Sequence, residues 1–133
     1  MAIRVKQTTY GPIWATMDSE GTLLFGDNEA MLSATPPLVR PGVTLLYSIA
    51  SCMILSLQAV AKRKRLTIHP FSIEVTSHKG EELPVHFARY DIALSHGCHS
   101  DPDIAMQLLN SAKSICTVSN SLSGTFTLRI RDE

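Results

Sequence analysis

The stretch VTLLYSIASCMILSLQAVAK, residues 43–62, decides the fold. It contains no proline or glycine, carries no charge before Lys62, and repeats its apolar residues at the three- and four-residue spacing of a helix. A helix of this length is roughly 30 Å long, so in a chain of 133 residues it must run through the middle and bury most of its circumference. The other flank of the helix carries small polar side chains, which allow the backbone of a neighbouring segment to approach closely: Thr44, Ser48, Ser51 and Ser56.

A membrane span is the alternative for this stretch, since its length matches a bilayer. Its serines, Tyr47 and Gln58 dilute its apolar character and no second span follows, so we expect a core helix and no membrane partner. The basic run at 62–65 closes the helix, where the macrodipole favours positive charge. The formal net charge is zero, and we interpret this run as a solvated helix end rather than a nucleic-acid site.

The length predicts one domain, residues 1–133, with enough apolar residues for a core. The first ten residues, MAIRVKQTTY, lack the apolar segment of a signal peptide, so we expect a cytoplasmic protein. Three widely spaced cysteines do not form a disulfide framework. In a reducing compartment they are free, catalytic or redox-active.

Alternating residues and turn signals around the helix predict strands. Three antiparallel strands, joined by turns at 10–12 and 18–21, are expected at 1–7, 13–17 and 22–25. A proline-rich loop, 26–42, leads into the helix. After the helix, a hairpin is expected from strands 66–77 and 84–95, with Pro70 marking a bulge or an edge.

A second helix is predicted to begin at Ser100-Asp101-Pro102-Asp103, which offers a capping hydroxyl or carboxylate, an early proline and an acid in the first turn. Its apolar stripe comprises Ile104, Leu108, Ala112 and Ile115. One further helical turn at 117–123 and a final strand at 125–131 complete the order βββ–α–ββ–α–(α)–β, an α+β fold. One chain has difficulty covering the long helix, and we therefore expect a homodimer.

Cys52 and Cys116 are the leading candidates for chemistry, because each lies on an apolar helical segment beside serines. They could be two buried cysteines that act as small hydrophobes, or a pair that cycles between dithiol and disulfide. The run His96-Gly97-Cys98-His99 could ligate zinc or copper, but it lacks the paired spacing of a closed site, and we interpret it as a surface loop. We expect no metal and no cofactor.

The long helix, the following hairpin and the run AKSICTVSNSL at 112–122 together resemble the OsmC/Ohr family of osmotically inducible and organic hydroperoxide resistance proteins. The resembling pattern is a cysteine midway along a central helix followed by a run similar to A-K-x-x-C-P-V-S-N-S-L, in which Thr117 here replaces the proline. The resemblance covers about residues 36–130. It implies an intertwined α+β homodimer with active sites at the subunit interface.

The resemblance also implies a cysteine-based peroxidase of the stress response that reduces organic hydroperoxides. Cys52 matches the peroxidatic cysteine and Cys116 the resolving one. A thiolate at Cys52 would become a sulfenic acid, Cys116 would condense with it, and a dithiol reductant, of lipoyl type in the family, would reset the pair. The alternative is an OsmC-fold protein without this activity that binds a small apolar ligand at the dimer interface.

Two positions depart from the family pattern. Val43 stands where relatives usually carry a glutamate, and no arginine occurs between Val5 and Val39, where relatives carry the arginine that activates the thiolate. A cysteine in the middle of a buried helix needs a nearby cation to ionise at neutral pH. Arg40, just before the helix, and Arg4, on the first expected strand, are the candidates to replace it.

Overall fold

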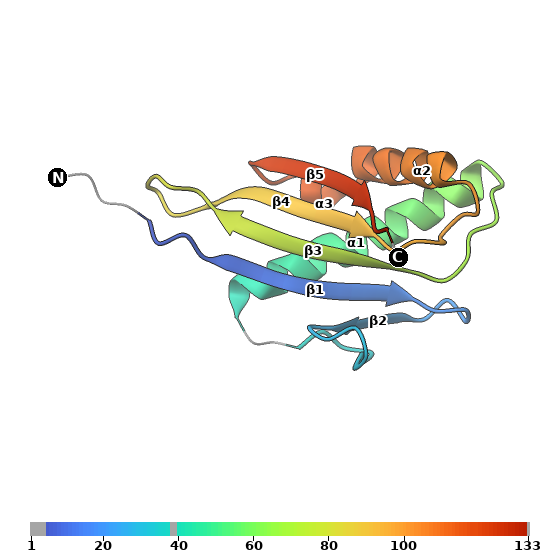
Figure 1. Cartoon of the computed structure of the whole chain (residues 1–133), viewed down its shortest axis with the longest axis horizontal. Coiled ribbons are helices and arrows are strands. Elements are labelled where there is room, and N and C mark those ends of the chain that lie inside the picture. The colour runs from blue at the N-terminus through green and yellow to red at the C-terminus, as the bar shows by residue number, and fades with distance from the viewer. Residues whose placement is uncertain (1–4, 38–39, 133) are drawn as a thin grey trace.

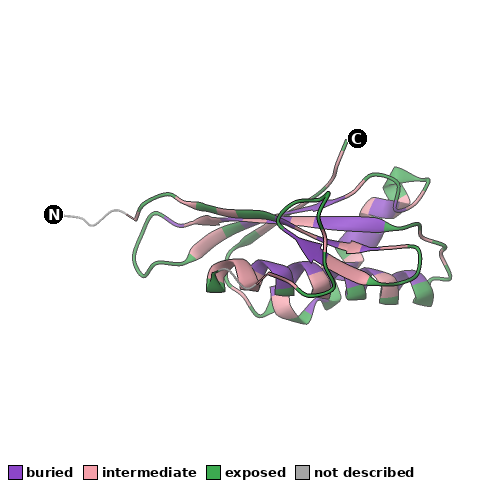
Figure 2. Ribbon diagram, turned by 90° about the horizontal axis from the view of Figure 1, so that it is seen from below, coloured by how far each residue is buried: buried purple, intermediate pink, exposed green. Residues whose placement is uncertain are grey.

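The fold is a two-layer α+β arrangement, a sheet with helices packed against it (Figure 1). The structure is a computed structural model, and it describes residues 5–37 and 40–132. In Figure 2 the sheet lies above the long helix, and the buried residues gather between the two layers. The mixed class predicted from the sequence is confirmed.

Five strands form the sheet in the order β2-β1-β3-β4-β5. They are β1 Thr9–Met17, β2 Leu23–Gly26, β3 Phe71–Lys79, β4 Phe87–Leu94 and β5 Thr125–Ile130. Neighbouring strands are antiparallel except β4 and β5, which are parallel. A parallel pair needs a long crossover connection, and here helices supply it.

The helices are α1 Pro41–Arg63, α2 Pro102–Ile115 and α3 Thr117–Asn120. Each of the two longer helices begins with proline in its first turn, where the missing N–H costs nothing. The Asp101 carboxylate caps α2 by accepting a hydrogen bond from the Asp103 N–H at 2.9 Å. The second helix and the extra turn therefore form where the sequence predicts them.

Helix α1 supplies the largest part of the core. It packs against β1, β3 and α2, and its apolar face is shielded from solvent. Six of its large apolar residues are at most 4% exposed: Leu46, Ile49, Met53, Ile54, Leu57 and Val60. A single chain thus covers most of the apolar surface for which we expected a partner. The uncovered face is instead a strip of mostly small residues in which Leu55 is 56% exposed.

The N-terminal region differs from its prediction. Residues 1–4 of the expected first strand lie outside the described residues, and residues 5–8 are not in a strand. The predicted turn at Tyr10-Gly11-Pro12 lies inside β1, which pairs with β3 on both sides of an irregularity between Tyr10 and Ile13. Gly11 has a φ of +92°, and an added Cβ would lie 2.7 Å from the Val75 carbonyl oxygen. The glycine and proline therefore form a bulge, because the flanking residues remain paired with β3.

Three smaller predictions are also corrected. Strand β3 begins at Phe71 rather than at residue 66, since Pro70 cannot donate to the sheet. Ser56 lies on the buried side of α1 instead of on its small polar flank. Ile115, the last residue of α2, is 43% exposed and does not continue the buried stripe of that helix.

Within the described residues, α1 alone has the length and composition of a membrane span. Half of its most apolar window is buried inside the fold, and its apolar face contacts the sheet and α2. This is the placement of a core helix.

Leu57→Ala should lower the free energy of unfolding by about 2–5 kcal/mol, because Leu57 is fully buried between α1 and its neighbours. Leu83→Ala is the matched control, since Leu83 lies in the β3–β4 loop and is 52% exposed; its cost should stay within about 0.5 kcal/mol. Urea unfolding of both variants at one protein concentration measures the difference. Equal costs would contradict the role of α1 as the core helix.

Candidate active site

Cys52 lies on α1 at the border between the buried face and the exposed strip. It is half-buried, whereas the next residue, Met53, is fully buried. The Ser51 hydroxyl is occupied by the helix itself, donating to the Tyr47 carbonyl oxygen at 2.9 Å. The Cys52 thiol is therefore placed by the rigid middle of a long helix and remains within reach of solvent.

Cys116 lies at the break between α2 and α3 and is fully buried. Its backbone is extended, with φ −77° and ψ 100°, so the chain leaves α2 and starts α3 at this residue. Its N–H donates to the Lys113 carbonyl at 3.2 Å, and its own carbonyl accepts from the Asn120 N–H at 3.0 Å. Both ends of the residue are thus held by backbone hydrogen bonds.

The two thiols meet across the contact between α1 and α3. The Cys116 side chain lies beside that of Cys52, close enough for each thiol to affect the ionisation of the other, although the two residues are far apart in the sequence. Burial raises the pKa of Cys116, and the neighbouring Cys52 raises it further. Ser119 acts in the opposite direction and only partly offsets this. Cys116 therefore keeps its proton when Cys52 is a thiolate and can donate to it.

Side chains around the α2–α3 break fix its shape. The Lys113 ammonium donates to the Asn120 side-chain oxygen at 2.7 Å and lies 4.6 Å from the centre of the Phe126 ring. The Asn120 amide also donates to the Ser114 carbonyl at 3.0 Å. Ser119 is 1% exposed and directed toward Cys116. Ser119 and Asn120 were not predicted as site residues. They lie three and four residues after Cys116, where the first turn of a helix that starts at the cysteine would place them near it.

Arg40 is placed at the start of α1, away from Cys52 in the same chain. Its guanidinium lies 4.1 Å above the centre of the Tyr10 ring. Cys52 is three turns further along the helix, about 18 Å along its axis. Within one chain the structure therefore does not bring Arg40 to Cys52, and an approach from a second copy stays a prediction. Arg4, the other candidate, lies outside the described residues.

Cys98 lies in the core, although the sequence predicts a surface loop at 96–99; His96 and Gly97 of that run are exposed. Cys98 is fully buried, its carbonyl accepts from the His69 N–H at 2.9 Å, and burial raises the pKa of its thiol to about 11. The His99 ring accepts a hydrogen bond from the Asp101 N–H at 3.0 Å. Among the residues that the structure describes, no group of three histidine, cysteine or acidic side chains could hold a metal ion.

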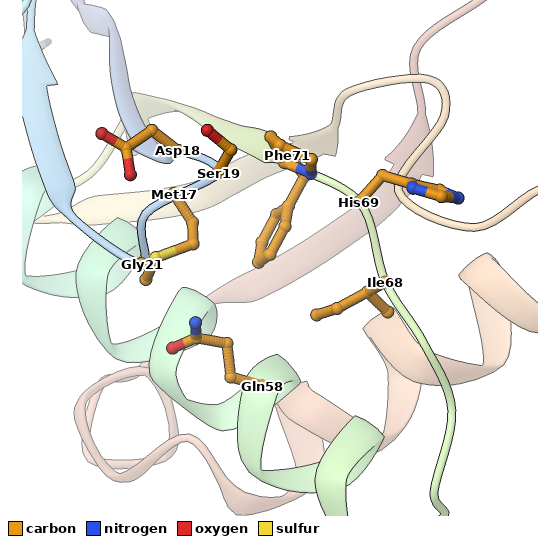
Figure 3. Close-up of a pocket in the computed structure, with 9 residues that line it drawn as sticks. Met17, Asp18, Ser19, Gly21, Gln58, Ile68, His69 and Phe71 are labelled. Carbon is orange, nitrogen blue, oxygen red and sulfur yellow. The ribbon is translucent and has the colours of Figure 1, made fainter.

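A separate depression of about 250 Å³ lies near the C-terminal half of α1. Figure 3 shows Gln58 of α1 directed toward Met17 and Phe71, whereas the His69 ring points away from them. The Asp18 carboxylate is occupied by the β1–β2 turn, where it accepts from the N–H groups of Glu20 and Thr22. These groups do not combine into an acid–base arrangement, so the two thiols remain the candidate reactive centre.

The sequence profile of the OsmC-like protein family matches residues 35–131, which include both cysteines and the α2–α3 break. The chain belongs to the OsmC-like family. A search of curated protein sequences finds no match. The family resemblance drawn from the helix and the run at 112–122 is thereby confirmed.

Solved structures confirm the OsmC fold for this family member. The organic hydroperoxide resistance protein OhrB of Bacillus subtilis is 16% identical, with a TM-score of 0.62 over 97% of this chain and 98% of that one. An organic hydroperoxide resistance protein OsmC from Legionella pneumophila is 16% identical, with a TM-score of 0.60 over 98% and 97%. An OsmC-like protein from Mycoplasma pneumoniae is 15% identical, with a TM-score of 0.59 over 98% of each chain.

Burial and thiol ionisation predict the order in which the three free cysteines react. Iodoacetamide at pH 8 should modify Cys52 first, because Cys98 and Cys116 are fully buried and burial raises the pKa of each. Labelling of Cys98 should increase only as the pH approaches about 11, since the thiolate is the reactive form. Peptide mass spectrometry after timed labelling measures all three rates. Faster labelling of Cys98 than of Cys52 in the folded protein would contradict the assignment.

The pH dependence of iodoacetamide labelling at Cys52 also tests whether Arg40 of a second copy is the cation that activates this cysteine. Arg40→Ala should slow modification of Cys52 at neutral pH, and the wild-type rate should return as the pH rises. Arg63→Ala is a control, because Arg63 lies at the far end of the same helix and is exposed. Superimposable pH profiles for wild type and Arg40→Ala would exclude Arg40.

Proposed function

We propose that this chain is a thiol-dependent peroxidase that reduces organic hydroperoxides and contributes to peroxide resistance. The observation that carries the proposal is the contact between the Cys52 and Cys116 thiols, which two separate helical segments bring together. Membership of the OsmC-like family and the fold shared with organic hydroperoxide resistance proteins support it. Three free cysteines suit a reducing cytoplasm.

In the proposed reaction the two thiols have different roles, which follow from their different exposure to solvent. The half-buried Cys52 thiolate attacks the distal peroxide oxygen, an alcohol leaves, and Cys52 becomes a sulfenic acid. The buried Cys116 then attacks the Cys52 sulfur, which forms the disulfide and releases water. A dithiol reductant, of lipoyl type by family resemblance, returns both cysteines to thiols.

We also propose that the exposed strip of α1 is covered by a second copy of the chain. The strip follows one helix face through Thr44, Ser48, Cys52 and Leu55. Small side chains permit close approach of two helices, and Leu55 provides an exposed apolar contact. A homodimer formed here would bring a second chain beside Cys52.

A second candidate function is the binding of a small, largely apolar ligand without peroxidase chemistry. A pocket of about 320 Å³ lies between the β1 bulge and α1 and is lined by Pro12, Ile13, Asp27, Val43 and Tyr47, with Gly11. Among the residues that the structure describes, the buried Tyr47 hydroxyl has no hydrogen-bond partner. Burial, and then the negative charge of Asp27, raise the pKa of Tyr47, so its phenol is a hydrogen-bond donor at neutral pH. A ligand oxygen could accept from it.

One equivalent of cumene hydroperoxide should consume two thiols of the reduced protein and form a Cys52–Cys116 disulfide, leaving Cys98 free. Intact-mass and peptide-mass spectrometry measure the product. Cys98→Ser is the matched control and should react like the wild type, because Cys98 is buried away from the pair.

Two further variants separate the steps of this reaction. Cys116→Ser should accumulate a sulfenic acid at Cys52, and Cys52→Ser should leave the hydroperoxide unconsumed. A wild-type protein that retains both thiols after exposure to the hydroperoxide would exclude the peroxidase and favour the ligand-binding alternative.

Leu55→Arg should weaken the proposed dimer and raise its dissociation constant at least about tenfold, because a charge would replace an apolar contact. Sedimentation velocity over a concentration series measures this. Leu83→Arg is the control, since Leu83 is similarly exposed but lies in the β3–β4 loop. A wild-type chain that sediments as a folded monomer at micromolar concentration would contradict the dimer.

A further inference from the structure

The pocket between the β1 bulge and α1 is separate from the thiol pair, since neither Cys52 nor Cys116 lines it. It has a volume of about 320 Å³, which is enough for a small organic molecule. Pro12, Ile13 and Val43 supply apolar surface to its wall. Its occupant must therefore present an apolar body to these side chains.

The Tyr47 hydroxyl is the feature of this pocket that points to a ligand. Tyr47 is 2% exposed, and its ring is held edge-on against Phe25 with the ring centroids 6.0 Å apart. Within residues 5–37 and 40–132, no group forms a hydrogen bond with the buried hydroxyl. Burial of a hydroxyl without a partner destabilises a fold, and a bound molecule that accepts a hydrogen bond from it removes this cost.

Asp27 supplies the second polar group of the pocket. It follows β2, is exposed, and lines the same pocket as Tyr47. Because burial and the charge of Asp27 raise the pKa of Tyr47, the phenol keeps its proton at neutral pH. The pocket thus offers one donor and one acceptor. A single O–H group satisfies both, since its oxygen accepts from Tyr47 while its hydrogen is donated to Asp27.

The charges around the pocket disfavour an ionised ligand of either sign. The Asp27 carboxylate repels an anion. Arg40 precedes α1 and lies over the ring of Tyr10, the residue before the bulge, and the N-terminus of α1 adds positive potential, so a cation is disfavoured as well. A neutral hydroxyl is the group that fits both the hydrogen-bonding and the charge of this site.

We propose that this pocket binds a small neutral alcohol, a molecule with one hydroxyl group on a compact apolar body. The inference rests on the second candidate function, which it narrows from an apolar ligand to one that carries a hydroxyl group. Binding in this pocket requires neither thiol, so it can be tested without peroxide.

Three probes that share one ring separate the ligand classes: cyclohexanol, cyclohexylammonium and cyclohexanecarboxylate. Each is titrated into the reduced, ¹⁵N-labelled wild-type protein at pH 7 and followed by amide chemical shifts. Cyclohexanol should shift the signals of Ile13 and Val43, which line the pocket, and both ions should bind at least about tenfold more weakly.

Tyr47→Phe should weaken the binding of cyclohexanol about tenfold, because it removes the donor. The urea midpoint of the free protein should stay unchanged or rise, because the variant loses no hydrogen bond. Tyr10→Phe is the matched control, since Tyr10 is half-buried and does not line the pocket; it should bind cyclohexanol like the wild type. Asp27→Asn should strengthen the binding of cyclohexanecarboxylate, because the repelling charge is gone.

The other outcomes also decide the inference. Tighter binding of either ion than of cyclohexanol, or equal affinity for cyclohexanol in Tyr47→Phe, would overturn the assignment to alcohols. A lower urea midpoint or weaker self-association of Tyr47→Phe would show that the hydroxyl is paired within the fold or with a second copy, which would overturn it too. Binding of none of the probes would remove both this inference and the second candidate function, and leave the peroxidase proposal standing. Binding of cyclohexanol at the pocket by a protein that is inert to hydroperoxides would support the inference and remove the peroxidase.

Discussion

The burial of one face of α1 against the sheet is the constraint on which the rest of the structure depends. A helix of this length and apolar content must be covered along most of one side. Strands β1 and β3 cover it from the sheet, and α2 covers it from the side. Once this face of α1 is buried, the residues on the opposite face are necessarily exposed, and Cys52 lies at the border between the buried and the exposed face.

The position of Cys116 follows from the connection between two parallel strands. Strands β4 and β5 lie side by side, so the chain must cross over between them, and α2 with α3 forms this crossover. The break between the two helices falls at Cys116, next to the middle of α1. The meeting of the thiols therefore depends on the sheet order as much as on the cysteines themselves.

The electrostatics of the pair favour unequal roles. Cys116 has a raised pKa in a fully buried position, and it lies beside the more accessible Cys52. Arg40 is engaged with the Tyr10 ring at the start of α1, and Val43 stands at the position where the family pattern has a glutamate. This chain therefore lacks the glutamate and the N-terminal arginine expected from the resemblance, and the supply of a cation to Cys52 by a second copy stays a prediction.

Local rules determined much of this protein from the sequence alone. Helical spacing located α1, a capping side chain and an early proline located the start of α2, and the cysteine within AKSICTVSNSL marked the C-terminal motif. The bulge at Gly11 and the late start of β3 were not predictable, because they depend on which strands pair. Only the tertiary structure decided that Cys52 meets Cys116 and not Arg40. Sequence spacing sets which side of a helix a residue occupies, whereas contacts between segments arise from how the sheet and helices pack together.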